Sequence, residues 1–166
     1  GLISFLVKSP IQLESDANMT TLALDHMISN LPGHVYWKNE AGVYLGCNNK
    51  QAHSLGLQSG TDVVGKTDFE LPWPQSSAEA FRKHDIQVIQ SGKPLLTEEP
   101  ATIEGQDATV LSHKIPLKNK LGKIVGILGM SLDITKQKET STTRSDRMYL
   151  FGLNKGQTNQ VNDKEA

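Results

Sequence analysis

The sequence is poor in cysteine and aromatic residues, and it contains no long apolar run. Its single cysteine, Cys47, excludes an internal disulfide and any metal site built from several cysteines, and it fits a reducing, cytoplasmic compartment. No apolar run approaches the ~20 residues that a membrane-spanning helix needs. The opening Gly1–Val7 has no positively charged region before it and is a poor signal peptide. We therefore expect a cytoplasmic segment without membrane contact.

The charge is balanced, because 17 basic residues oppose 18 acidic ones and give a net charge of −1. A near-neutral chain has no general electrostatic reason to bind nucleic acid, so none is expected as a partner. The chain has 166 residues, of which 37% are hydrophobic, enough for one domain with a core and extensions. There is no initiator methionine, so we expect a piece of a longer protein.

Helical periodicity marks the N-terminal part of the chain. The spacing predicts an amphipathic helix over Asp16–Asn30 that is capped by Ser15 or Asp16 and ended by Pro32. Its apolar face consists of Ala23, Leu24, Met27, Ile28 and Leu31. This face requires a cover, either from this chain's own sheet or from a partner's, and periodicity alone does not distinguish the two.

The rest of the pattern is typical of an α+β fold. Two β-prone runs, 34–39 and 43–48, flank a glycine-containing turn and predict a hairpin. A short helix follows to Gly56, and a longer one is predicted from Ser76 to Gln90 with Gly92 after its end. Strands are predicted over 95–99, 108–117 and 124–132, which gives an antiparallel sheet of five strands. From Lys136 onward the composition predicts a mobile tail, with one apolar patch at Met148–Leu153.

One motif match is rejected on its context. Residues Gly60–Thr67 fit the phosphate-loop pattern G-x-x-x-x-G-K-[ST]. Such a loop needs a buried strand before it and a helix after it, because the helix N-terminus holds the phosphate. Here the preceding residues are polar and helix-like, and the following Asp68–Pro74 contains two prolines and two acidic residues. We therefore expect no nucleotide hydrolysis.

Signatures of other enzymes and of metal sites are absent from the sequence. The five histidines lie far apart, and Glu98 and Glu99 occupy adjacent strand positions, which face opposite sides of a sheet. We expect no catalytic residue, no resident metal and no enzymatic turnover.

Five segments in order resemble a PAS sensor domain of bacterial sensor histidine kinases. They are 31–48, 64–68, 81–85, 91–94 and the closing Asp133-Ile134-Thr135. The resemblance implies a PAS domain at residues 25–135, after an N-terminal segment and helical linker at 1–24 and before an outgoing linker at 136–166. It implies a five-stranded antiparallel sheet in the order 2-1-5-4-3, with helices on one face around a small cavity. It also implies a signal junction at which Asp133 and Thr135 hydrogen-bond and set the exit of a helix that starts at Lys136.

The resemblance further implies a regulatory module that binds a small ligand or a partner, forms a homodimer and relays the change through its flanking helices. A two-component sensor histidine kinase is the expected parent, although no phospho-accepting histidine box follows residue 140. The alternative is a gas or redox sensor in which His84, next to Asp85, would ligate haem iron. A flavin photosensor needs a cysteine in the central helical segment, whereas Cys47 lies in the second predicted strand. Flavin binding without photochemistry stays open, and no cofactor is the main expectation.

Residues that could line the cavity are proposed from strand alternation and from one helix face. Phe81, His84 and Val88 share a face of the predicted helix 76–90. The complete set is Tyr36, Tyr44, Cys47, Phe81, His84, Val88, Val110, Ser112, Leu128 and Met130. Cys47 is also expected to serve as a small buried hydrophobe.

Overall fold

The computed structural model describes residues 9–140, so the predicted patch at Met148–Leu153 and the opening Gly1–Val7 lie outside the described residues. Four helices and five strands follow one another together with two short 3-10 turns. Their bounds are α1 Pro10–Asn30, β1 His34–Asn39, β2 Tyr44–Cys47, α2 Asn49–Ser54, η2 Gly60–Val63, η3 Asp68–Glu70, α3 Gln75–Ser91, β3 Leu95–Ile103, β4 Gln106–Lys118, β5 Ile124–Asp133 and α4 Thr135–Thr140.

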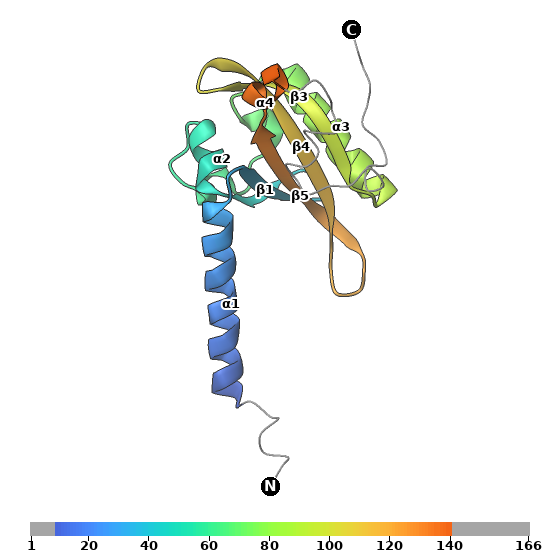
Figure 1. The fold of residues 1–166 in the computed structure, drawn as a ribbon. Helices are drawn as coiled ribbons and strands as arrows, with labels where there is room; N and C mark the ends of the chain where they lie inside the picture. The colour runs from blue at the N-terminus through green and yellow to red at the C-terminus, as the bar shows by residue number, and fades with distance from the viewer. Residues whose placement is uncertain (1–8, 141–166) are drawn as a thin grey trace. The chain divides into compact units, whose positions relative to one another are not determined.

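The strands form one antiparallel sheet in the order β2-β1-β5-β4-β3, which confirms the predicted topology (Figure 1). The last strand in sequence, β5, lies at its centre between β1 and β4. Edge strand β3 runs on to Ile103, beyond the predicted end at Glu99. The extension was not predicted because Pro100 interrupts the sequence pattern of a strand. An edge strand nevertheless tolerates proline, since the missing N–H donor can face solvent.

Helix α1 belongs to a unit that ends at Leu31, and the second unit begins at Pro32. The predicted cap at Ser15 or Asp16 is wrong. The Ser9 side chain accepts a hydrogen bond from the Gln12 N–H at 3.1 Å, and Pro10 occupies the first turn, where its missing N–H costs nothing. The helix is therefore longer than predicted, and the expected boundary after residue 24 falls inside it. None of its residues is buried.

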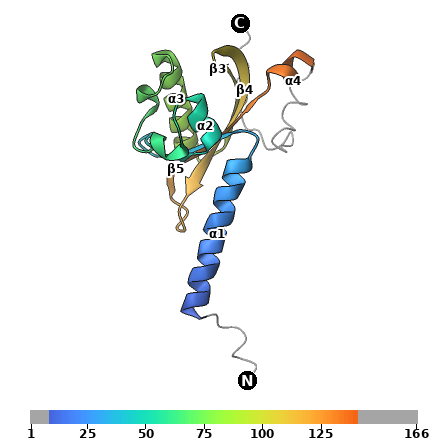
Figure 2. The same cartoon turned by 90° about the vertical axis from the view of Figure 1, so that its left-hand side faces the viewer.

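In the second unit, α2 and α3 lie on the same face of the sheet (Figure 2). Helix α3 ends as predicted, at Gly92, whose φ of 66° is the left-handed conformation that glycine adopts most readily. The core beneath the helices contains Tyr44, Ala52, Val63, Val88 and Ile127, and all five are almost fully buried. These contacts fix the distance between the helices and the sheet.

The phosphate-loop lookalike has an ordinary structural role. Gly60 begins the 3-10 turn η2, and its N–H donates to Asn49 Oδ1 rather than to an anion. Gly65, with a φ of 84°, lets the chain turn back so that its own N–H donates to the Tyr44 carbonyl at 2.9 Å. This segment therefore packs along the outer edge of β2, and its glycine N–H groups bond within the protein, which agrees with the rejection of the phosphate-loop motif.

Candidate functional site

A cavity of about 340 Å³ lies between the inner face of the sheet and the elements that cover it. This volume is at the lower end of the ~300–1,000 Å³ that is typical of small-molecule sites. The residues on its wall are His34, Tyr36, Lys38, Tyr44, Gln51, Ser54, Leu55, Asp68, Pro72, Trp73, Phe81, Glu99, Ala101, Thr102, Ile103, Glu104, Gly105, Val110, Ser112 and Ser131.

Strand alternation decides which side chains reach the cavity. Tyr36 and Lys38 of β1 point inward, whereas Trp37 between them does not line it. Directly opposite Tyr36 on β5 is Gly129, and a β-carbon at this position would overlap the Tyr36 ring. The missing side chain of Gly129 therefore provides the space that the phenol ring occupies.

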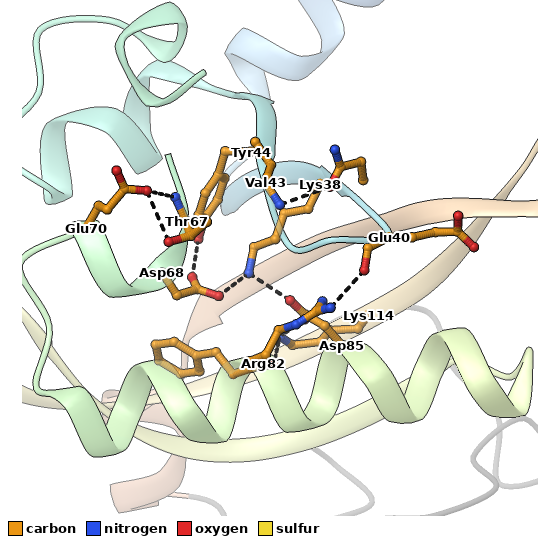
Figure 3. Close-up of polar contacts among 12 residues, drawn as sticks. Lys38, Glu40, Val43, Tyr44, Thr67, Asp68, Glu70, Arg82, Asp85 and Lys114 are labelled. Carbon is orange, nitrogen blue, oxygen red and sulfur yellow. Dashed lines mark hydrogen bonds and ion pairs between the residues drawn. The ribbon is translucent and has the colours of Figure 1, made fainter. Parts of the chain in front are cut away.

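A buried ammonium group forms the floor of the cavity. Lys38 Nζ donates to Asp68 Oδ2 at 2.5 Å and to Asp85 Oδ2 at 2.8 Å, and the lysine side chain is 1% exposed. Asp68 also accepts a hydrogen bond from the Tyr44 hydroxyl at 2.8 Å. Figure 3 shows the two carboxylates converging on Lys38 from η3 and from α3. The ion pairs thus join β1 to both covering elements.

A second lysine completes this network from β4. Lys114 Nζ donates to Asp85 Oδ1 at 2.6 Å, so each oxygen of Asp85 accepts from a different ammonium group. Burial raises the pKa of Asp85, but Lys114 and Lys38 outweigh this effect and hold the pKa below its ordinary value. Asp85 is therefore ionised, and it belongs to a network of two basic and two acidic side chains, Lys38, Asp68, Asp85 and Lys114, called the charge tetrad below.

The two tyrosines of the wall keep their protons. Burial raises the pKa of Tyr36 and that of Tyr44 well above 10. Their rings lie 5.8 Å apart, and Lys38 Nζ is 4.7 Å from the Tyr44 ring centroid, within cation–π range. The Tyr44 hydroxyl donates to Asp68, and the Tyr36 side chain lines the cavity beside it.

Another part of the cavity wall combines a carboxylate with an indole. Glu99 Oε1 accepts from Thr97 Oγ1 at 3.0 Å and lies 2.8 Å from His84 Nδ1, although the latter contact lacks hydrogen-bond alignment. Burial raises the pKa of Glu99, but His84, Lys114 and Thr97 together hold it below its ordinary value. Trp73 stacks edge-on against Phe81 at 5.4 Å, and its buried Nε1–H has no partner within residues 9–140.

Five of the ten predicted cavity residues line the wall, and five do not. The lining residues are Tyr36, Tyr44, Phe81, Val110 and Ser112. Cys47 and Val88 belong to the packed core, and His84 faces Glu99. Leu128 and Met130 do not line the cavity. The register of β5 pairs them with Trp37 and Val35, so they lie on the face of the sheet that is turned away from the cavity. That any of these residues contacts a ligand stays a prediction.

Sequence reasoning missed the charged part of the wall. Lys38, Asp68, Glu99 and Trp73 were not among the predicted residues, and neither were Asp85 and Lys114 behind them. The sequence did contain an indication of these charges, since Lys38 and Lys114 each occupy an inward-facing position of a strand. A lysine there requires a buried acidic partner, and this points to the aspartates of the covering elements.

The geometry does not favour the haem alternative. His84 is not part of the cavity wall, and its Nδ1 lies against Glu99. In the described part of the chain, no three His, Cys, Asp or Glu side chains are grouped to hold a metal ion. Cys47 lies in β2, outside the central helical segment that a flavin photosensor would use.

The closing junction has the predicted hydrogen bonds. The N–H and the hydroxyl of Thr135 both donate to Asp133 Oδ1, at 3.0 and 2.6 Å, and the Thr109 N–H donates to Thr135 Oγ1. Between them, Ile134 is fully buried and packs with Leu96 and Leu111. Helix α4 therefore leaves the sheet from a fixed point, although a role in signalling stays a prediction.

A curved antiparallel sheet with helices over a small cavity defines a sensor-type α+β domain. A family model described as the PAS fold matches residues 28–139, so the chain belongs to this family, a class of regulatory sensor domains.

Among curated relatives, the virulence sensor protein BvgS of Bordetella pertussis is 28% identical over 116 residues, which are 68% of this chain and 9% of BvgS. The chain thus spans a small part of that relative. The PAS domain of BvgS has a TM-score of 0.56 at 23% identity, covering 84% of this chain and 99% of that one.

Vibrio cholerae VqmA, described as a dimer and a LuxR-type receptor with target DNA, has a TM-score of 0.64 at 27% identity, covering 70% of this chain and 53% of that one. A further structure shows VqmA bound to DPO, with a TM-score of 0.62 at 27% identity over 68% of this chain and 57% of that one. Because this neighbour has a DNA target, the expectation that nucleic acid is no partner lacks support. Among the helices between residues 9 and 140, none combines the length and apolar character that crossing a bilayer requires.

Proposed function

We propose that this PAS domain is a signal-input module whose cavity binds a small molecule. The observation that carries the proposal is the cavity itself, about 340 Å³ with an apolar, aromatic wall and a few fixed polar groups at its floor. VqmA, a structural neighbour at 27% identity, is described as bound to DPO, and this supports a ligand-binding role for the fold.

The relay would start at the charge tetrad, because it ties the cavity floor to the covering elements. Lys38 contacts Asp68 of η3 and Asp85 of α3, and Asp85 in turn contacts Lys114 of β4. A ligand that changes the hydrogen bonds of Lys38 would bias the position of α3 against the sheet. Strand β4 also carries Thr109, whose N–H is held by Thr135 at the start of α4, so one strand connects the cavity with the outgoing helix.

Dimerisation would use α1. Five of its residues and Leu31 directly after it repeat at alternating spacings of four and three, the spacing of a coiled-coil seam; the five are Leu13, Ala17, Thr20, Leu24 and Met27. The large members of this seam are between 40% and 62% exposed. A second copy of α1 would cover them, and the spacing of the seam favours a partner helix over a sheet.

The parent protein is proposed to be a sensor histidine kinase that acts in the cytoplasm through this non-catalytic input domain. The match to BvgS supports this reading. The second candidate is a ligand-controlled DNA-binding regulator, which the VqmA structures favour, at 27% identity against 23% for the structure of the BvgS PAS domain. The sequence of the full-length parent protein decides between them, since a histidine box with an ATP-binding lobe supports the first and a helix-turn-helix the second.

A fragment screen tests the ligand-binding role. A panel of anionic, cationic and uncharged ring compounds is added to the labelled chain, and shifts of cavity resonances are followed by nitrogen–proton NMR. We expect binding that Ala101→Phe abolishes, because Ala101 lines the cavity mouth. Its cross-strand partner Ala108 is equally half-buried and does not line the cavity, so Ala108→Phe is the matched control. If no compound of any charge shifts these resonances, the proposal fails.

Sedimentation analysis tests the dimer. Leu24 lies in the α1 seam and Leu22 outside it, and they are 51% and 52% exposed. Leu24→Glu should convert a dimer into a monomer, because it places a charge in the apolar seam, whereas Leu22→Glu should leave the dimer intact. A wild-type chain that is monomeric at all concentrations contradicts this part of the proposal. An absorption spectrum of the purified chain tests the remaining haem and flavin alternatives.

A further inference from the structure

The buried charges at the cavity are paired inside the protein and leave none over for a charged ligand. Lys38 and Lys114 are balanced by Asp68 and Asp85 at distances of 2.5 to 2.8 Å. Of the other two carboxylates of the wall, Glu99 already accepts from Thr97 and contacts His84, and Glu104 is exposed to solvent. An anion entering this cavity meets three carboxylates and no unpaired cation, and a cation meets the Lys38 ammonium at low dielectric.

Two hydrogen-bond donors of the wall have N–H bonds left over, those of Trp73 and Lys38. The Trp73 Nε1–H is buried and has no acceptor among the described residues. The Tyr36 side chain also lines this wall, and its hydroxyl can donate as well as accept. An ammonium group has three N–H bonds, and Lys38 uses two of them for its aspartates. Because a buried donor without a partner costs about 1–3 kcal/mol, this wall favours an occupant that supplies acceptors.

The apolar part of the wall is aromatic. Tyr36, Tyr44, Trp73 and Phe81 surround the cavity, with ring pairs at 5.8 and 5.4 Å. Flat rings offer the best contact to such a surface, and the volume of about 340 Å³ admits a compound of one or two rings.

Resting on the proposed function, we infer that the ligand of this cavity is a small, uncharged ring compound that carries hydrogen-bond acceptors such as a carbonyl oxygen or a ring nitrogen. Its acceptors face Lys38, Tyr36 and Trp73, and its ring lies among the aromatic side chains.

Three probes that share one ring and one size but differ in charge test this inference. They are nicotinamide, which is uncharged, nicotinate, which is an anion, and 3-(aminomethyl)pyridine, which is a cation at neutral pH. Dissociation constants are measured on the full chain by NMR titration of cavity resonances. We expect nicotinamide to bind at least about tenfold more tightly than either charged probe, a difference of ~1.4 kcal/mol.

A charge change in the wall should then alter the preference. Asp68→Asn removes one negative charge and should raise the affinity for nicotinate relative to nicotinamide by about tenfold. The matched control is Glu70→Gln on the same 3-10 turn, because Glu70 is exposed and bonds only to Thr67. If Asp68→Asn does not fold, Glu99→Gln tests the same point, since Glu99 also lines the cavity and should alter the ratio in the same direction.

The outcomes separate this inference from the proposed function. A charged probe that binds as tightly as nicotinamide, or the absence of binding by all three probes, overturns the inference. The proposed function falls only if the whole fragment panel, with every charge class present, leaves the cavity resonances unchanged. Tight binding of nicotinate to the wild-type chain would thus refute the ligand class while supporting a ligand-binding cavity.

Discussion

Replacing Asp85 with asparagine tests the charge tetrad most severely. Asp85 is fully buried on α3 and accepts from Lys38 at 2.8 Å and from Lys114 at 2.6 Å. The amide that replaces the carboxylate carries no charge, so Lys114 loses its only partner carboxylate among residues 9–140 and Lys38 retains only Asp68. Removing one member of a buried ion pair costs about 3–5 kcal/mol. We expect a loss of this size in the free energy of unfolding.

Urea unfolding at neutral pH, followed by tryptophan fluorescence, measures the loss. Glu79→Gln is the matched control, because Glu79 lies on the same helix but is exposed and bonds to Gln75. This control should change the free energy of unfolding by less than about 0.5 kcal/mol. The double variant Asp85→Leu with Lys114→Met should be more stable than Asp85→Asn, since it removes both charges of one pair. If Asp85→Asn lowers the free energy of unfolding by less than about 1 kcal/mol, the result contradicts the stabilising role of the tetrad.

The pH dependence gives a second readout of the same group. The pKa of Asp85 is lower in the folded chain than its ordinary value of 3.8, because Lys114 and Lys38 outweigh the effect of burial. Its contribution to stability is therefore complete above this ordinary value and is lost as the pH falls through the folded pKa. The wild-type chain should lose more stability than Asp85→Asn when it is acidified below about pH 4. Parallel pH profiles of the two proteins would contradict this reasoning.

Four further predictions concern other parts of the domain. Burial lowers the pKa of His34 below 6.5, so the free energy of unfolding should fall as the pH drops through 6.5, and His34→Gln should reduce this fall in urea titrations. Burial raises the pKa of Cys47 to about 11, so a disulfide reagent should label the native thiol far more slowly than the unfolded one. Gly129→Ala places a β-carbon against the Tyr36 ring and should cost about 1–3 kcal/mol in thermal or urea unfolding. Asp133→Ala removes the acceptor at the start of α4, so amides of this helix should exchange faster and stability should fall by about 0.5–2 kcal/mol.

The fold was predictable because its signals are local and occur in order. The alternation of the strands, the glycine-containing turn between β1 and β2 and the glycine after α3 all lie where the sequence places them. The start of α1 was missed because Ser15 and Asp16 are good capping residues, whereas Ser9 with Pro10 provides the cap that the structure uses. Two neighbouring caps of similar quality are not distinguished by propensity alone.

The site was harder to predict, because its charged half depends on contacts between distant segments. Lys38 meets Asp85 across 47 positions of the chain, and alternation shows only that Lys38 points inward. Leu128 and Met130 were assigned to the cavity because β5 is apolar on both faces, so its pattern does not reveal which face is inner. The register against β1 decides this, and the register depends on pairing that one sequence does not show.

The chain contains two tryptophans, and their indole N–H signals give the most direct test of the central claim, that a small molecule occupies the cavity beneath α3. Trp73 lines this cavity with a buried Nε1–H, whereas Trp37 lies on the other face of β1. At least one compound of the fragment panel should shift the indole signal of Trp73 in a saturable manner and leave that of Trp37 in place. If every compound of the panel shifts Trp37 alone, or neither signal, the result contradicts the account.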